Sequence, residues 1–232
     1  MISIVIPVYN EARIVREAAV ELCRKLDDLR WEYELVLSEN GSTDGTPEVL
    51  EQLAARIPRL RWLHEPEPNY GRALKRGILE ARGEVVICDE IDLCDVRFYQ
   101  RALPLLEAGA DLVVGSKAMK GANDARPLVR RLATRVITLL LRAITGFRGT
   151  DTHGLKAFKR ERLVDVARAC VVDRDLFASE LVIRAQRMGR DVREIPITLQ
   201  ERRPPSTALL QRVPRVLKGL LKLGWTIRFR HR

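Results

Sequence analysis

Four carboxylates stand close together near the middle of the chain, directly after the apolar run EVVIC at 84–88. Within seven residues lie Asp89, Glu90, Asp92 and Asp95. Like charges at short range raise one another's pKa, so such a loop favours a bound cation. A few hard oxygen ligands suit Mg²⁺ or Mn²⁺, which completes its shell with water and a substrate diphosphate. The alternative is an acidic loop in solvent whose Asp95 caps the helix that begins near Val96.

Two further polar loops carry residues suited to binding. PVYNEA (7–12) ends the first apolar run, and ENGSTDGT (39–46) follows the second. The second loop supplies the carboxylates of Glu39 and Asp44 and contains two turn dipeptides. Either loop could be an ordinary turn, the second leading into a helix capped by Asp44 or Thr46. Three polar loops that agree with one another favour a common site.

The elements that must position these loops alternate along the chain. Apolar runs predict strands at 2–6, 33–37, 61–65, 84–88 and 111–115. Helical spacing predicts helices over 11–29, 47–56, 71–82, from Val96, and over 127–146. Continuous apolar strands separated by helices indicate an α/β fold, a Rossmann-like, mostly parallel sheet flanked by helices. Ligands of such sheets bind at the carboxyl ends of the strands, where the three loops gather.

Composition limits the class of protein. The 232 residues carry a formal net charge of +10, yet nine of the Lys and Arg residues, and no acid, fall between Arg202 and Arg232. The four cysteines show no C-x-x-C pair, which argues against zinc and a disulfide scaffold and predicts a reduced, cytoplasmic location. We expect neither secretion nor a membrane-spanning segment, because no apolar stretch of ~18 residues occurs.

The motifs together resemble family 2 glycosyltransferases with the GT-A fold, in particular the branch of dolichol-phosphate mannosyltransferases and related polyprenyl-phosphate sugar transferases. The likeness runs from Ile2 to about Thr207. PVYNEA resembles the family's opening motif, ENGSTDGT its D-D-G-S-x-D-G-T loop, and residues 69–92 its G-x-G-x-A…D-x-D run. Further likenesses are GSK (115–117), DTHGLKAFKRERL (151–163) and residues 177–203. Glu39-Asn40 replaces the usual pair of Asp, and Glu90 replaces the first Asp of D-x-D.

The resemblance implies a role for particular residues. Glu90 and Asp92 would hold the metal. The donor would be contacted by Pro7, Tyr9, Glu11, Glu39, Asp44, Gly71, Arg72, Glu90 and Lys117. The catalytic residues would be Asp89, Asp92, Arg131 and Arg202. Lys117, Arg131 and Arg202 would face an acceptor phosphate, which suits the forked guanidinium of arginine.

The function that the resemblance implies is metal-dependent, inverting transfer of a sugar from a UDP- or GDP-linked donor to a polyprenyl phosphate, with Mg²⁺ or Mn²⁺ as cofactor. A hydroxyl acceptor and a non-catalytic relative that binds nucleotide-sugars are the alternatives. We expect a GT-A domain over 1–207, with a nucleotide-sugar-binding half (1–117) and an acceptor half (118–207). Residues 208–232 would form an appended helix.

The basic tail predicts an amphipathic helix from Pro214, a residue that favours the first turn of a helix. Its apolar positions are Val216, Leu217, Leu220, Leu221 and Ile227. Such a helix could lie in a membrane interface, on the cytoplasmic face, near a lipid-linked acceptor. Alternatively, its apolar side packs on the domain or on a second copy in a homodimer. Nucleic acid is not an expected partner, because charge alone would support it and aromatic residues make up only 5% of the chain.

Overall fold

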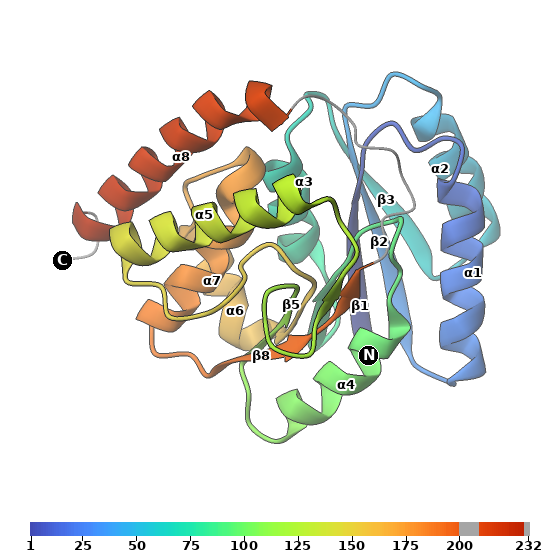
Figure 1. The fold of residues 1–232 in the computed structure, drawn as a ribbon. Coiled ribbons are helices and arrows are strands. Elements are labelled where there is room, and N and C mark those ends of the chain that lie inside the picture. The colour runs from blue at the N-terminus through green and yellow to red at the C-terminus, as the bar shows by residue number, and fades with distance from the viewer. Residues whose placement is uncertain (200–208, 230–232) are drawn as a thin grey trace.

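The structure, a computed structural model, describes residues 1–199 and 209–229 (Figure 1). The strands are β1 Ile2–Val8, β2 Tyr33–Asn40, β3 Leu60–Glu65, β4 Val85–Cys88, β5 Leu112–Ser116, β6 Asn123–Asp124, β7 Lys156–Lys159, β8 Val192–Pro196 and β9 Thr198–Leu199. The helices are α1 Val15–Asp28, α2 Thr46–Arg56, α3 Tyr70–Glu80, α4 Val96–Glu107, α5 Leu128–Thr145, α6 Arg160–Ala169, the 3-10 turn η1 Arg174–Leu176, α7 Phe177–Arg187 and α8 Leu209–Phe229. The predicted alternation of strands and helices up to β5 is confirmed.

A seven-stranded sheet organises the chain in the order β3-β2-β1-β4-β7-β5-β8. Strand β7 is antiparallel to both of its neighbours, β4 and β5, whereas the other pairs are parallel. The α/β class with a mostly parallel sheet is therefore confirmed. The two predicted halves are interleaved, because β5 from the first lies between β7 and β8 from the second.

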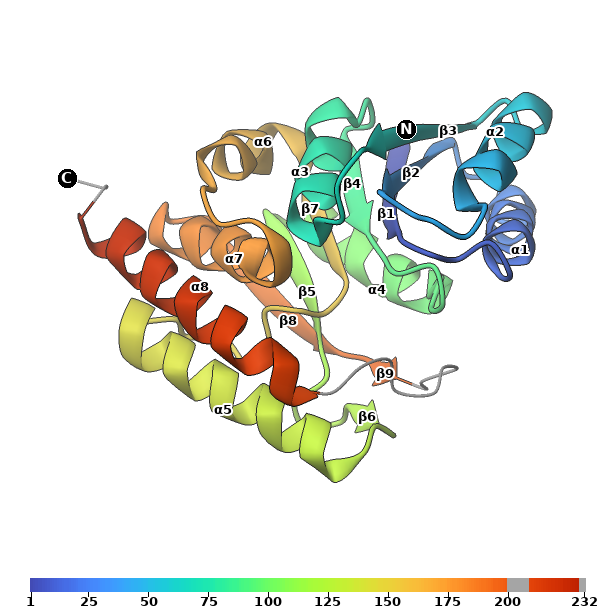
Figure 2. The ribbon, with the colours of Figure 1, turned by 90° about the horizontal axis from the view of Figure 1, so that it is seen from above.

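The inner strands β1, β4 and β5 bury side chains on both faces, which explains why their sequences read as nearly continuous apolar runs. On β1, Ile4 and Ile6 pack with α1, α2 and α4, while Val5 packs on the opposite face with α3, α6 and α7. Figure 2 shows α1 and α2 at one end of the molecule and α5 and α8, side by side, at the other. The loops that follow β1, β2, β4 and β5 thus share one edge of the sheet.

The C-terminal helix differs from the prediction that Pro214 occupies its first turn. Helix α8 begins at Leu209, so Pro214 lies inside it and not in its first turn. A proline there removes one amide donor, and packing of the later turns compensates, since tertiary contacts supply most helical stability. Leu220, Leu223 and Ile227 are at most 2% exposed, so this side of α8 packs on the domain. No helix in the described part of the chain is long and apolar enough to cross a bilayer.

Candidate active site

The first two predicted loops are bonded directly to each other. The amide of Asn10 donates to Ser42 Oγ at 2.9 Å, and Asn10 Oδ1 accepts from the amide of Thr43 at 2.8 Å. The amide of Ala12 donates to Asp44 Oδ2 at 3.1 Å. These contacts fix the two loops as one surface beside the ends of β1 and β2. Helix α2 has Gly45 as its N-cap residue, which has no side chain to cap the helix, and Asp44 Oδ1 instead accepts from the amide of Thr46 at 3.2 Å.

Glu39 lies beneath this surface and is fully buried. Its Oε1 accepts from the amide of Ser42 at 2.5 Å, and its Oε2 lies 2.5 Å from Nδ1 of His64. This pairing could not be predicted from the sequence, because His64 lies on the neighbouring strand β3. The side chain of the adjacent Asn40 accepts from the amide of Asn69, the N-cap residue of α3. The two residues that replace the family's Asp pair therefore anchor the loop to β3 and α3.

The loop after β4 divides its carboxylates between structure and solvent. Asp89 is 2% exposed and accepts from the amides of Glu90 at 2.6 Å and Asp95 at 2.9 Å, and from the Tyr99 hydroxyl. Burial raises its pKa to about 7, although these hydrogen bonds oppose the shift. Asp95 accepts from the amide of Arg97 at 3.1 Å, which confirms the predicted cap of α4. Glu90, in contrast, is exposed and Asp92 half-buried.

Glu90 and Asp92 fit a divalent ion whose remaining ligands come from a substrate and from water. Within residues 1–199 and 209–229 no group of three or more His, Cys, Asp or Glu side chains could hold a metal by itself. Two accessible carboxylates offer hard oxygen donors only, which is the donor set of Mg²⁺ or Mn²⁺ in sites completed by phosphate oxygens and water. Asp89 and Asp95 are turned to backbone amides and hold this loop in shape.

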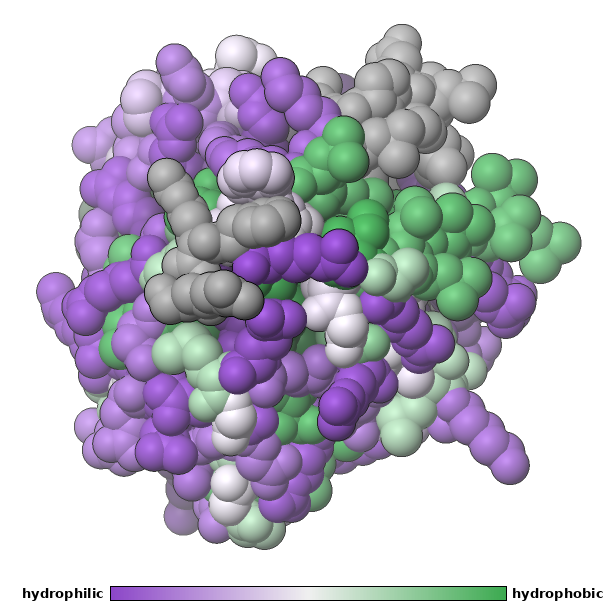
Figure 3. Space-filling model, turned by 90° about the vertical axis from the view of Figure 1, so that its left-hand side faces the viewer, coloured by the Kyte–Doolittle hydropathy of each residue, from purple (hydrophilic) through white to green (hydrophobic). Residues whose placement is uncertain are grey.

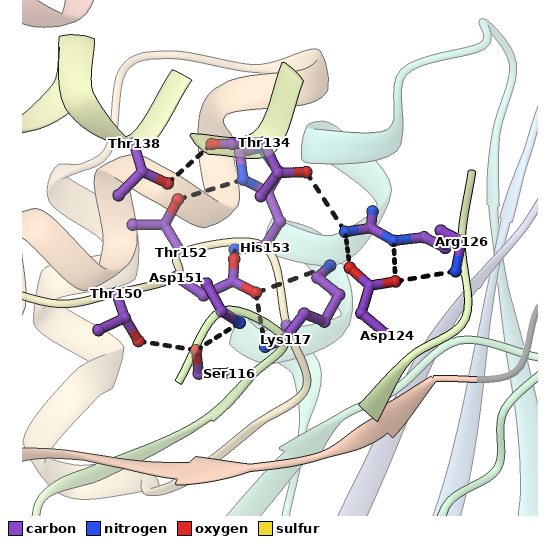
Figure 4. A network of polar contacts seen from close by, with 12 residues as sticks. Ser116, Lys117, Asp124, Arg126, Thr134, Thr138, Thr150, Asp151, Thr152 and His153 are labelled. Carbon is purple, nitrogen blue, oxygen red and sulfur yellow. Dashed lines mark hydrogen bonds and ion pairs between the residues drawn. The ribbon is translucent and has the colours of Figure 1, made fainter. Parts of the chain in front are cut away.

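A second polar group lies at the end of β5 and is drawn in Figure 4. Lys117 Nζ lies 3.8 Å from Asp151 Oδ2, and the Lys117 amide donates to the same oxygen at 3.1 Å. The Asp151 side chain is fully buried. Burial opposes its ionisation, but the charge of Lys117 and the amide of His153 outweigh this and lower its pKa. Lys117 is therefore held at the site by a buried carboxylate.

Lys156 is a buried cation that sequence reasoning missed. It is 2% exposed and begins β7, where it pairs in register with Cys88 on one side and Val114 on the other. Because β7 runs antiparallel, its start lies at the same edge as the ends of β4 and β5. Its Nζ donates to the Gly154 carbonyl at 2.7 Å. Burial lowers its pKa to about 8, despite the nearby charges of Asp151 and Glu90. The available signal was its place in DTHGLKAFKRERL (151–163), a stretch that resembles the family.

The remaining predicted site residues are spread around this edge. Pro7 is half-buried within β1, and Tyr9 is 44% exposed just beyond it, while Glu11 donates its amide to Thr46 Oγ1. Gly71 packs on η1, since a Cβ there would lie 2.6 Å from the Arg174 amide nitrogen. Arg72 is exposed beside Glu67, at 3.8 Å.

In the half predicted to shape the acceptor side, Arg126 donates two hydrogen bonds to the carboxylate of Asp124, at 2.8 and 2.7 Å, ahead of α5. Arg131 is half-buried in the first turn of α5. Arg202 lies outside the described residues. The structure therefore brings Tyr9, Asp44, Glu90, Asp92 and Lys117 to one edge of the sheet, as predicted, and assigns supporting contacts to Glu39, Gly71 and Asp89.

The fold and this edge define a GT-A-type α/β protein. Residues 3–177 match the family described as glycosyl transferase family 2, to which the chain therefore belongs.

Among curated proteins, the chain is 29% identical to glycosyltransferase AglD of Haloferax volcanii over 238 residues, covering all of this chain and 38% of that protein. It is 28% identical to dolichyl-phosphate beta-glucosyltransferase ALG5A of Trichomonas vaginalis, covering 86% of this chain and 66% of that one. It is 31% identical to an undecaprenyl-phosphate 4-deoxy-4-formamido-L-arabinose transferase of Pseudomonas fluorescens, covering 87% and 58% respectively. The chain thus spans less than two thirds of the length of these relatives.

Among solved structures, the fold resembles glucosyl-3-phosphoglycerate synthase from Mycobacterium tuberculosis in complex with uridine diphosphate, with a TM-score of 0.67. That alignment covers 97% of this chain and 80% of the other, at 22% identity. At this identity the likeness establishes the fold.

Proposed function

We propose that the chain is a metal-dependent, inverting glycosyltransferase that moves a hexose from a nucleotide-diphosphate sugar to a polyprenyl phosphate. The observation that carries the proposal is the accessible pair Glu90 and Asp92, held at the end of β4 by the inward-facing Asp89. Two of the relatives are named as transferases for dolichyl and undecaprenyl phosphates, which supports the lipid-phosphate acceptor.

The donor would lie across the ends of β1, β2 and β4. Tyr9, 44% exposed, offers an aromatic face to the base, and the bonded loops that contain Glu11 and Asp44 form the floor. Glu90 and Asp92 would hold Mg²⁺ or Mn²⁺, which offsets the charge of a diphosphate when bound. A structure of glucosyl-3-phosphoglycerate synthase, which has a similar fold, contains Mn²⁺ and uridine diphosphate, and this supports a UDP-linked donor over a GDP-linked one.

The acceptor phosphate would approach from the side of Lys117. A phosphate monoester is anionic near neutral pH, so its oxygen can attack the anomeric carbon without a general base. The bond from that carbon to the diphosphate oxygen breaks with inversion, and the leaving diphosphate takes the electron pair. Catalysis would rest on alignment and fixed charge. A hydroxyl acceptor would need a base, and the Asp89 carboxylate is buried against two amides and a hydroxyl, which favours the phosphate.

Peripheral contact with the cytoplasmic face of a membrane also belongs to this proposal. The described part of α8 exposes Leu221 at 73% and Trp225 at 67% between Lys218, Lys222 and Arg228. Tryptophan and basic residues suit a membrane interface. A homodimer remains the competing proposal for the same surface.

Calorimetric titration of UDP and GDP, each with and without Mn²⁺, tests the donor site in the purified protein and in Asp92→Ala. Metal-dependent binding of one nucleotide that the substitution abolishes would support the proposal and identify the donor base. If neither nucleotide binds, the chain is not an enzyme of this kind. If nucleotide binds but no sugar reaches a polyprenyl phosphate, a hydroxyl acceptor or a non-catalytic relative becomes the better description.

A further inference from the structure

Helix α5 exposes a row of large apolar side chains. Leu128 is 75% exposed, Val129 68%, Leu132 62%, Val136 46% and Leu139 60%. We call these residues the α5 stripe. Their spacing places them on one side of the helix, away from Thr138, Leu141 and Thr145, which face the domain. Soluble proteins seldom expose so many large apolar residues in one row, and such a surface marks an interaction site.

The stripe borders α8 and its exposed side chains. At the contact between the two helices, a Cβ on Gly224 would lie 2.4 Å from Ile144 Cγ2, so the helices approach closely. Leu221, one turn before Gly224, and Trp225 remain exposed on α8. Figure 3 shows hydrophobic side chains gathered and projecting along one edge of this face of the molecule. The buried side of α8 holds the helix in place, so the exposed apolar surface is centred on α5.

The charge around the stripe has one sign. Helix α5 carries Arg130, Arg131, Arg135 and Arg142 and no acidic residue. The described part of α8 adds the exposed basic residues Lys218, Lys222 and Arg228. An apolar row within such a basic surface is complementary to anionic lipid headgroups above acyl chains. Pairing the same surface of two copies would bring like charges together, which disfavours a dimer.

We propose that the α5 stripe is the principal membrane-docking surface and that it seats the chain on an anionic bilayer. The inference rests on the proposed lipid-linked acceptor for its purpose. The stripe begins just after the pair of Asp124 and Arg126, which lies beside Thr134 near Lys117 (Figure 4), so docking there brings the acceptor side of the site to the headgroups. The C-terminal helix then acts as a support for α5 that adds Leu221 and Trp225 at the border.

Co-sedimentation of the full chain with vesicles tests the docking. The vesicles are phosphatidylcholine with and without phosphatidylglycerol, and the variant is Leu128→Gln with Leu132→Gln and Leu139→Gln. Glutamine keeps helix propensity, and the replaced side chains touch little of the domain. We expect wild-type protein to sediment with anionic vesicles and the triple variant to bind at least about tenfold more weakly, because each leucine loses its apolar burial. Val20→Gln, at a 49% exposed position on α1, is the matched control and should bind normally.

Two results would overturn the proposal. One is equal vesicle binding by the triple variant and the wild type. The other is a wild-type dimer in sedimentation velocity that the triple variant converts to monomer without any vesicle binding, which would assign the stripe to a second copy. Sugar transfer to a short-chain, water-soluble polyprenyl phosphate, measured without vesicles, distinguishes failure of the docking proposal from failure of the proposed function. The triple variant should match the wild type there, and inactivity of both with intact vesicle binding would reject the function and leave the docking surface.

Discussion

His64 and Glu39 form a pair between neighbouring strands, with the histidine Nδ1 lying 2.5 Å from Oε2 of the fully buried glutamate. The other carboxylate oxygen accepts from the Ser42 amide. A shorter aspartate at this position would withdraw the carboxylate from one of these partners. The length of the Glu39 side chain, compared with aspartate, therefore lets its carboxylate connect the second loop to β3.

This pair predicts the effect of Glu39→Gln. A neutral amide can accept from Ser42 or contact His64 but loses the charge-assisted bond, so the loop that carries Asp44 is held less firmly. We expect nucleotide affinity to fall by about fivefold, as the loss of roughly 1 kcal/mol implies. Calorimetry with the nucleotide and Mn²⁺ measures it. Glu48→Gln, at an exposed position on α2, is the control and should bind as the wild type does.

The proposed metal contact of Glu90 predicts different effects for a shorter carboxylate and for loss of the charge. Glu90→Asp keeps a carboxylate and should retain metal-dependent nucleotide binding, whereas Glu90→Gln should weaken it by more than about tenfold, a loss typical of disturbed metal sites. Titration of Mn²⁺ in the presence of nucleotide tests both variants. Equal binding by Glu90→Gln and the wild type would show that the carboxylate holds no metal.

The buried ammonium of Lys156 predicts a pH dependence. Burial lowers its pKa to about 8, so the group carries its charge at neutral pH and loses it as pH rises through that value. We expect kcat/KM for a phosphate acceptor to fall above about pH 8, and Lys156→Met to lower it at neutral pH and remove that step.

The lowered pKa of Lys156 also makes the free energy of unfolding depend on pH. Between about pH 8 and the ordinary lysine value of 10.5, the unfolded chain binds the proton more tightly, so the wild type should gain stability as pH rises. Urea titrations across this range measure the gain, and Lys156→Met should lack it. A step in kcat/KM that persists in Lys156→Met would assign the titration to another group.

Tyr99→Phe should lower stability through Asp89. Burial raises the pKa of Asp89 to about 7 from 3.8, so ionisation costs the folded state, and stability falls as pH rises from about 4 to about 7. Above that range the Tyr99 hydroxyl bonds a charged carboxylate. We expect its removal to cost about 1.5–3 kcal/mol at pH 8 and less at pH 5. Urea denaturation at the two pH values measures the difference, and equal losses would contradict the assignment.

Gly71 and the neighbouring Arg72 should give opposite phenotypes. Gly71→Ala would place a Cβ 2.6 Å from the Arg174 amide nitrogen, so it should cost about 1–3 kcal/mol of stability through overpacking. Arg72→Ala removes an exposed side chain and should change stability by less than about 0.5 kcal/mol while weakening donor binding. Thermal melts and nucleotide titration together test the pair. A stable Gly71→Ala protein with weak donor binding would show that Gly71 serves donor binding and not packing.

Local patterns predicted most of the donor side, because apolar runs and turn residues act within short stretches of chain. The cap of α4 by Asp95 and the gathering of Tyr9, Asp44 and Glu90 at one edge followed from such patterns. Pairing between distant segments did not. The insertion of β7 beside β4, which buries Lys156, depends on sheet register that no single stretch encodes.

The buried sides of α5 and α8 could not be predicted from the sequence either. Both helices have apolar spacing, yet Leu220 is buried and Leu132 is exposed. Which apolar side faces the domain is decided by the neighbouring helices, and the sequence predicts only that such a side exists. The placement of Pro214 in the first turn of α8 was wrong for a related reason, since packing of the later turns maintains a helix through this residue.

The position of β5 between β7 and β8 bears on how such a catalyst can be altered. A fragment ending near Lys117 would keep the donor loops but leave β5 without either hydrogen-bonding neighbour. The donor and acceptor sides therefore cannot be exchanged as separate modules between related chains. Under the proposed function, changes of sugar or lipid preference would arise by substitution within one interleaved sheet, where each altered side chain also affects the stability of the fold.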